Sequence, residues 1–191
     1  QYSVGYFRNF KDNMFEASVE VYFKHLWNQI EYSENYVNEL NVDQERGYVF
    51  GNGKAYGIEL FLKKRTGKLN GWIGYTLSRS DRKFPDLNEG KVFPAKYDRT
   101  NDLTINIAYD FNKEWTIGAT WVYATGNAIT PITGIGIAEF SPFFIYGQRN
   151  SIRVPAYHRL DFSLNYSPVP KRRPNRRWQS SYNFSVYNVY N

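Results

Sequence analysis

The chain of 191 residues contains no cysteine, which excludes a disulfide framework and a thiolate metal site. Its formal net charge of +6 is compatible with nucleic acid, with an anionic surface or with neither, so charge alone selects no partner. Aromatic residues make up 19% of the chain, more than an ordinary core needs, and Tyr and Trp are favoured where a ring borders both an apolar phase and water, as at a membrane surface.

Alternation of apolar and polar residues predicts about eight β-strands, because successive side chains of a strand point to opposite faces. The pattern is clearest around Glu59, whose neighbours Ile58 and Leu60 share the opposite parity. No stretch has a comparable helical period. The predicted strands comprise residues 2–10, 14–32, 58–63, 69–78, 102–111, 115–124, 159–166 and 182–187.

Short and long connections alternate between these strands. The short ones have the length of hairpin turns, whereas loops longer than about 12–15 residues are uncommon in compact domains. Bacterial outer-membrane barrels have this asymmetry, with short turns at one end and long loops at the other. Gly51-Asn52-Gly53 is expected to form a turn between two strands. The expected turns are 11–13, 66–68, 112–114 and the longer reversal 168–177, and the expected long loops are 33–54, 81–96 and 127–152.

One parity of several predicted strands is apolar for about ten residues, which matches the 9–11 residues that a tilted strand needs to cross a membrane. The other parity carries many charges, and placing them unpaired in a dry core would cost several kcal/mol each. We therefore expect the apolar faces to meet lipid and the polar faces to line a wet interior. A spanning helix is not expected, since glycine and proline interrupt the uncharged stretch 115–138. The charges on the polar parity are Glu16, Glu20, Lys24, Glu59, Lys63, Asp102, Asp110, Arg159 and Asp161.

Several short motifs occur in order along nearly the whole chain. They are Gly57-Ile58-Glu59, Tyr75-Thr76-Leu77-Ser78, Asp98-Arg99-Thr100, Gly126, the run 155–161, and Asn188 with Asn191. On these motifs the chain resembles the C-terminal barrel of TonB-dependent outer-membrane receptors, and most closely those with an N-terminal carboxypeptidase-regulatory-like domain. The resemblance implies an all-β, antiparallel transmembrane β-barrel, 22-stranded with an internal plug, that imports a scarce extracellular ligand with energy delivered by TonB. It also implies the outer membrane of a Gram-negative bacterium.

On this basis residues 1–191 are expected to form the C-terminal part of such a barrel, with the plug, the TonB box and the earlier strands outside the chain. Both ends look like strand segments, at Tyr2 and at 189–191, although eight strands could also close a small barrel. The expected partners are TonB through N-terminal regions, outer-membrane lipids, an unknown small ligand, and a surface lipoprotein or another outer-membrane protein, but not nucleic acid. The alternatives are a structural or adhesive barrel without a transport cycle and a soluble all-β binding module.

Few residues are suited to catalysis, and we expect no enzyme activity, cofactor or metal site. The histidines fall on the lipid-facing parity, and the carboxylate pairs are explained by solvation as well as by acid–base or cation chemistry. The basic run 171–177 is interpreted as a solvated turn or a lipid-headgroup contact, because a nucleic-acid site needs aromatic platforms or a groove-entering element nearby. The groups considered are His25 and His158, and the pairs Glu31/Glu34 and Asp98/Asp102.

Ligand contacts are expected from the polar strand parity and from aromatic and charged residues of the long loops. Packing beneath the loops and contact with a partner protein are alternative roles for the loop aromatics, and siderophore, cobalamin, oligosaccharide and peptide remain open as ligands. The candidates are Glu59, Trp72, Phe93, Tyr97, Arg99, Asp102, Phe143, Tyr146, Arg149, Tyr157 and Arg159. Aromatic girdles at the membrane surfaces are expected from Trp115, Trp121, Tyr123, Tyr166, Trp178 and Tyr182.

Overall fold

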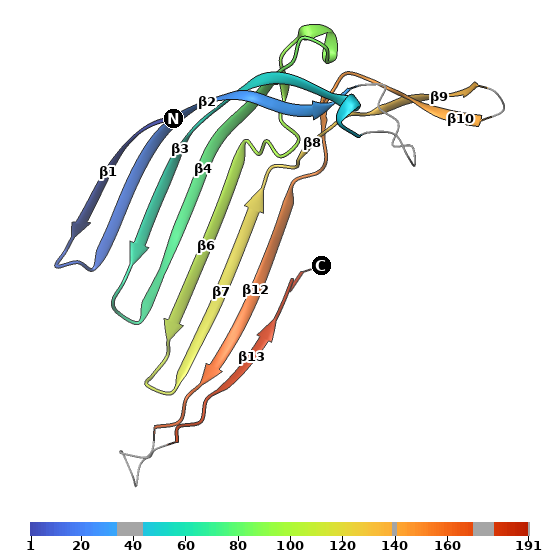
Figure 1. Cartoon of the computed structure of the whole chain (residues 1–191). Coiled ribbons are helices and arrows are strands. Elements are labelled where there is room, and N and C mark those ends of the chain that lie inside the picture. Colours follow the sequence, from blue (N-terminus) through green and yellow to red (C-terminus); the bar gives the residue numbers. More distant parts are fainter. Residues whose placement is uncertain (34–43, 139–140, 170–177, 191) are drawn as a thin grey trace.

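The computed structural model describes residues 1–33, 44–138, 141–169 and 178–190, which form an almost entirely β-stranded molecule (Figure 1). Its main feature is one antiparallel sheet whose principal strands follow the order of the chain. They are β1 (Tyr2–Phe10), β2 (Phe15–Tyr32), β3 (Tyr48–Lys64), β4 (Leu69–Lys83), β6 (Asn101–Asp110), β7 (Trp115–Ala124), β12 (Tyr157–Tyr166) and β13 (Tyr182–Val186). The predicted antiparallel all-β fold with about eight strands is therefore confirmed.

The three tight turns predicted at 11–13, 66–68 and 112–114 are present, and they lie together at one end of the sheet (Figure 1). In the last of them the side-chain oxygen of Asn112 accepts the backbone N–H groups of Glu114 and Trp115 at 2.8 and 3.0 Å. Such a contact replaces a backbone hydrogen bond and fixes the reversal. The longer connections lie at the opposite end, which we call the loop end.

The first long loop is shorter than predicted, because β3 begins at Tyr48, directly after the 3₁₀ helix η1 (Gln44–Gly47). The turn predicted at 51–53 is wrong: these residues lie inside β3. The reason is a close approach, since a Cβ atom on Gly51 would overlap the ring of Phe84. Glycine is therefore needed here for packing and not for chain reversal.

The other two long loops contain secondary structure that the sequence did not predict. The β4–β6 connection begins only after Lys83 and contains η2 (Asn88–Gly90) and β5 (Phe93–Pro94), which pairs with β4. The β7–β12 connection contains two short paired strands and one hairpin. These are β8 (Ala128–Ile129) with β11 (Ile152–Arg153), and β9 (Ile132–Ala138) with β10 (Ser141–Tyr146).

The strand register places apolar and polar residues on opposite faces of the sheet. Directly paired residues on successive strands form an apolar row of Val19, Leu60, Tyr75, Leu103 and Tyr123. The row displaced by one position consists of Glu20, Glu59, Thr76, Asp102 and Ala124 and is largely polar. The predicted parities are confirmed, because a slip of one residue would have exchanged the two faces.

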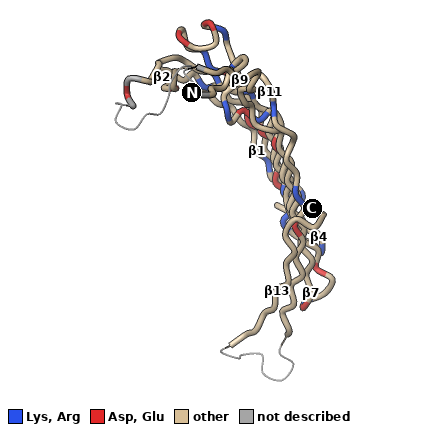
Figure 2. Tube along the Cα trace, turned by 90° about the vertical axis from the view of Figure 1, so that its right-hand side faces the viewer, with Lys and Arg blue, Asp and Glu red and all other residues tan. Residues whose placement is uncertain are grey.

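No second layer covers the apolar face within the described residues, and Figure 2 shows the sheet edge-on as a single bowed layer. Leu60 and Ile73 remain 42% and 40% exposed, values that a soluble sandwich core would not leave. β1 and β13 each pair on one side only, so the sheet is open. Among the described residues, no helix is long and apolar enough to cross a membrane.

Aromatic rings gather on the apolar face close to the tight turns. Trp115 stacks on Tyr166 with 4.4 Å between ring centroids, and Tyr166 lies 6.2 Å from Tyr182. Nearer the loop end, Trp121 and Tyr123 stack at 6.2 Å. These positions agree with two aromatic levels on the face that is expected to meet lipid.

Several sequence-based expectations concern the end of the chain. Residues Val189 and Tyr190 follow β13 in a turn, so the strand expected at 189–191 is wrong for these two residues. Glu34, Asn191, most of the reversal 168–177 and the basic run 171–177 lie outside the described residues.

Candidate functional site

The loop end carries a structured platform, which we define as residues 84–100, 125–138 and 141–156. Its apolar core consists of Phe84, Leu87 and Phe93, which are buried and pack against Val49 of β3. Phe84 occupies the space above Gly51, and its ring centroid lies 6.1 Å from that of Phe93. Phe93, a candidate ligand contact, is only 2% exposed and therefore has little surface to offer a ligand.

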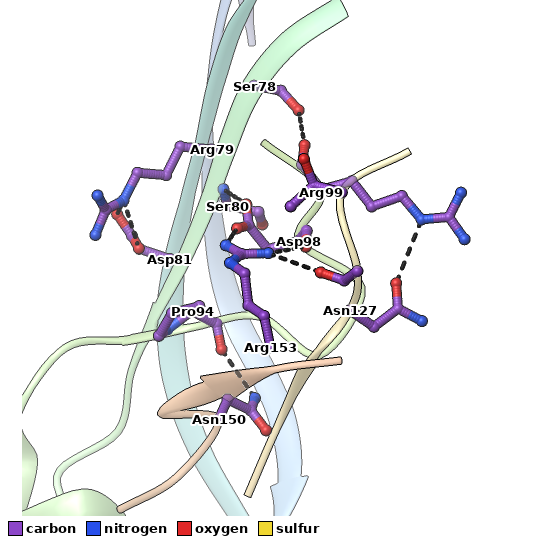
Figure 3. Close-up of polar contacts among 12 residues, drawn as sticks. Ser78, Arg79, Ser80, Asp81, Pro94, Asp98, Arg99, Asn127, Asn150 and Arg153 are labelled. Carbon is purple, nitrogen blue, oxygen red and sulfur yellow. Dashed lines mark hydrogen bonds and ion pairs between the residues drawn. The ribbon is translucent and has the colours of Figure 1, made fainter. Parts of the chain in front are cut away.

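An ion pair joins two parts of the platform (Figure 3); its carboxylate is buried, whereas the Arg153 side chain is 32% exposed. Asp98 is 3% exposed, its carboxylate pairs with the guanidinium of Arg153, and it also accepts the backbone N–H of Ser80 at 2.5 Å. Arg153 additionally donates to the carbonyl oxygens of Asp98 and Gly126 at 2.7 and 3.1 Å. Gly126 permits this approach, because a Cβ atom there would overlap the carbonyl oxygen of Val154.

A second group of polar contacts joins the same connections at another point. The side-chain amide of Asn150 donates to the carbonyl oxygen of Pro94 at 2.8 Å (Figure 3), and its backbone N–H donates to Thr130 at 3.1 Å. The backbone N–H of Arg149 donates to the Asn88 side chain at 3.2 Å. The Arg149 guanidinium pairs with the Glu31 carboxylate at 3.0 Å. Glu31 lies near the end of β2, so this ion pair links the platform to that strand.

Two candidate loop residues flank the buried aspartate. Tyr97 is 75% exposed, with the Lys96 ammonium 5.7 Å from its ring centroid. Arg99 donates to the side chain of Asn127 at 3.3 Å (Figure 3) and forms a longer ion pair of 3.7 Å with Asp102. Arg99 therefore spans the platform and the polar face of the sheet.

The β9–β10 hairpin extends away from the sheet at the loop end (Figure 1) and pairs only with itself in the described structure. Phe143 packs over Gly136, and Tyr146 lies 6.5 Å from Phe144 between ring centroids. Half or more of the surface of Phe143 and Tyr146 is exposed. The hairpin thus presents exposed aromatic and aliphatic side chains at the loop end.

The polar face of the sheet contains a hollow of about 250 Å³ that collects three further candidates. Glu59, Trp72 and Asp102 all line it, from β3, β4 and β6. Trp72 packs at 5.9 Å against Phe61, also in the lining. Carboxylates beside aromatic rings can bind hydroxyl-bearing or cationic groups.

The last two candidates lie where β12 begins. Arg159 pairs with Asp161 at 2.9 Å and donates to the Tyr157 hydroxyl at 3.2 Å. Its guanidinium also lies 4.1 Å from the ring centroid of Tyr187 and donates to that hydroxyl group. Arg159 is therefore held by protein groups on several sides.

The residues considered for catalysis are engaged elsewhere. The Asp98 carboxylate pairs with Arg153 while that of Asp102 faces Arg99, so each aspartate has its own cationic partner. His25 stacks on Trp27 at 3.8 Å, and Nδ1 of His158 lies 3.0 Å from the Tyr190 hydroxyl. The described part of the chain contains no group of three or more side chains able to hold a metal ion.

The structure thus divides the candidates into three places: the hollow, the platform with its hairpin, and the start of β12. Sequence reasoning missed Arg153, Asn150 and Asn88, which hold the platform together. Asp98 belongs to one of the motifs and to a predicted carboxylate pair, but the sequence does not identify Arg153 as its partner. The only available signal was the position of Arg153 directly after the third expected long loop, 127–152.

Solvent-exposed charge on the platform is partly paired. Glu89 accepts a hydrogen bond from Lys91, and this contact together with the positive charge lowers the pKa of Glu89 below its ordinary value. The pair lies in η2 and the residue that follows it. It stabilises the turn only while Glu89 is ionised.

Comparison with known proteins gives a consistent result. A family model described as "TonB dependent receptor-like, beta-barrel" matches residues 1–191. The structure is similar to the ferripyoverdine receptor of the outer membrane of Pseudomonas aeruginosa bound to ferripyoverdine, with a TM-score of 0.61 and 14% identity over 98% of this chain and 22% of that chain.

Two further solved structures have the same degree of identity. P. aeruginosa FpvA bound to a heterologous pyoverdine matches with a TM-score of 0.55 and 14% identity, over 86% of this chain and 20% of that chain. The FpvAI–pyocin S2 complex matches with a TM-score of 0.55 and 14% identity, over 86% of this chain and 21% of that chain. The chain therefore spans about a fifth of the length of these proteins. Comparison with the sequences of curated proteins gives no significant match.

Proposed function

Because the chain belongs to the TonB-dependent receptor β-barrel family, we propose that it forms part of a plugged barrel that takes up a scarce extracellular ligand across the outer membrane of a Gram-negative bacterium. Members of this family are receptors and transporters, not enzymes. In this proposal residues 1–191 supply the C-terminal wall of a 22-stranded barrel. TonB acts through regions outside this chain and delivers the energy for uptake.

The observation that carries the proposal is the pair of opposite faces on one uncovered sheet. The apolar row through Leu60 and Tyr75 suits lipid, and the adjacent row through Glu59 and Asp102 suits water and solute. All three described tight turns lie at one end, whereas the platform lies at the other. A barrel wall requires this combination, and a soluble sandwich does not.

Ligand is proposed to meet the platform first and the polar face second. On the platform, Tyr97 and the hairpin residues Phe143 and Tyr146 offer exposed rings. In the hollow, the indole ring of Trp72 and the carboxylate of Glu59 line the same surface. These groups support capture of a ligand with both apolar and polar surface, and they select no single class of nutrient.

The test is growth of cells that carry the intact receptor under nutrient limitation. A panel of ferric siderophores, cobalamin, oligosaccharides and peptides is supplied to cells with the receptor, without it, and with inactive TonB. We expect at least one nutrient for which loss of the receptor and loss of TonB impair growth equally. If no nutrient shows this pattern although the receptor is inserted, the barrel is structural or adhesive.

Two tryptophans on opposite faces provide matched variants. Trp72→Ala removes the indole ring from the hollow, whereas Trp115→Ala removes an indole ring that stacks on Tyr166 at the apolar face. We expect Trp72→Ala to raise the nutrient concentration for half-maximal growth about tenfold, the size of one lost aromatic contact. Trp115→Ala should leave this concentration unchanged at equal receptor level.

A further inference from the structure

We propose that the Asp98–Arg153 ion pair is a latch that joins the β4–β6 and β7–β12 connections into one unit, and that both residues are positioning residues for the ligand-capturing surface. The capture role rests on the function proposed above. The mechanical role does not, because it follows from contacts within the chain alone.

Asp98 is held at its buried site from two sides. It is 3% exposed, and its carboxylate is held by the backbone N–H of Ser80 in β4 and by Arg153 in β11. Removing Arg153 leaves the buried Asp98 charge without its cationic partner in a poorly solvated site. The connection that contains Asp98 is therefore fixed to a strand end on one side and to the neighbouring connection on the other.

Arg153 links three segments through one guanidinium group (Figure 3). One terminal nitrogen pairs with the Asp98 carboxylate, and the other donates to the carbonyl oxygens of Asp98 and Gly126. The planar fork of arginine suits this arrangement, and a lysine ammonium cannot reproduce it. Because Gly126 lies two residues after the end of β7, the latch also ties both connections to the sheet.

The polar contacts of Asn150 with Pro94 and of Arg149 with Asn88 join the same two connections at a second place. Two separate ties prevent rotation of one connection against the other. Tyr97 next to the latch and the hairpin beyond Asn150 therefore keep their relative positions. The surface is preassembled, so ligand capture does not require the two connections to close on each other.

Hydrogen exchange measured by mass spectrometry on the intact receptor, without any ligand, tests the latch. Arg153→Gln should raise exchange in both connections of the platform together, over residues 84–100, 125–138 and 141–156. The expected rise is about tenfold, because Arg153 is partly exposed and the pair is correspondingly weakened. Arg153→Lys, which keeps the charge, should give a smaller rise in the same two regions. Protection of residues 103–109 in β6 must stay unchanged, which shows that the barrel is intact.

The matched control is Arg79→Gln. Arg79 pairs with Asp81 at 3.0 Å, but both residues lie in β4, so this pair joins no two connections. Arg79→Gln should leave hydrogen exchange unchanged in both connections. The proposal is overturned if Arg153→Gln raises exchange only around residue 153, or if it has no more effect than Arg79→Gln.

The functional consequence is measured separately. With a nutrient whose uptake needs the receptor, Arg153→Gln should raise the half-saturating concentration while the maximal growth rate at saturation is kept. If Arg153→Gln raises exchange in both connections together but no nutrient depends on TonB and the receptor, the latch proposal stands and the proposed function is refuted. If Arg153→Gln raises exchange only around residue 153 while the receptor shows TonB-dependent uptake, the latch proposal is refuted and the proposed function stands.

Discussion

The assignment of lipid and water to the two faces of the sheet can be tested at two adjacent residues of β6. Ile105 lies on the apolar face, directly across from Ile73 and Trp121. Thr104 lies on the opposite face and lines the polar hollow. Replacing each with arginine adds the same side chain at nearly the same height but on opposite sides of the sheet.

The expected cost follows from the depth of Ile105 in the apolar band. On its face of the sheet, the band ends at Asn101, which accepts a hydrogen bond from the Tyr75 hydroxyl, and at Phe111. Ile105 is four residues from the first and six from the second, or about 13 and 20 Å along a strand at about 3.3 Å per residue. A strand tilt of about 40° reduces these distances to about 10 and 15 Å, close to the middle of a band about 25 Å high.

An arginine at this depth on the lipid face costs about 2–4 kcal/mol. Ile105→Arg should therefore destabilise the folded receptor by this amount, whereas Thr104→Arg should change stability by less than about 0.5 kcal/mol. The measurement is denaturant unfolding of the intact receptor in phospholipid vesicles, followed by tryptophan fluorescence. Equal effects of the two variants, or a larger effect of Thr104→Arg, would refute the assignment of lipid to this face.

Three further predictions concern the platform and the aromatic level. Phe84→Ala should remove the centre of the platform core and destabilise the platform locally by about 3–5 kcal/mol. Limited proteolysis of intact cells should then cleave the platform, while electrophoresis still shows the folded barrel. Trp115→Ala should lower the unfolding free energy in vesicles by about 1 kcal/mol through loss of its stacking on Tyr166, and an unchanged value would contradict the interfacial role. Carbon-13 NMR should show that the Glu89 carboxyl titrates below its ordinary pKa, and Lys91→Gln should return this pKa to the ordinary value. Because the pKa is depressed in the folded protein, the ion pair stabilises the turn at pH values above the ordinary pKa. This stabilisation is lost as the pH falls through the depressed pKa.

The strands and their faces were predictable because the relevant signal is local. Alternation around Leu60 and Glu59 fixes which side chains share a face, and register follows because a slip of one residue would place Glu59 on the apolar side. The short turns were also predictable from their polar residues and length. These features need no knowledge of distant parts of the chain.

The platform could not be predicted in the same way, because its stability comes from contacts between distant positions. The sequence around Gly51 predicts a turn, but Gly51 lies in β3 and leaves room for Phe84 of the β4–β6 connection. Arg153 lies 55 positions from Asp98, and nothing in the residues around either one identifies the other as its partner. Phe93 was an attractive ligand contact as an aromatic loop residue, but the same hydrophobicity buries it in the platform core.

The self-contained pairing of the β9–β10 hairpin has a consequence for evolution. Since its ladder involves no principal strand in the described structure, substitutions along it leave the pairing of the principal strands unchanged. Selection acting on the loop end can therefore change this hairpin without changing the register of the sheet. The same independence makes it a practical graft point for displaying foreign peptides on living cells.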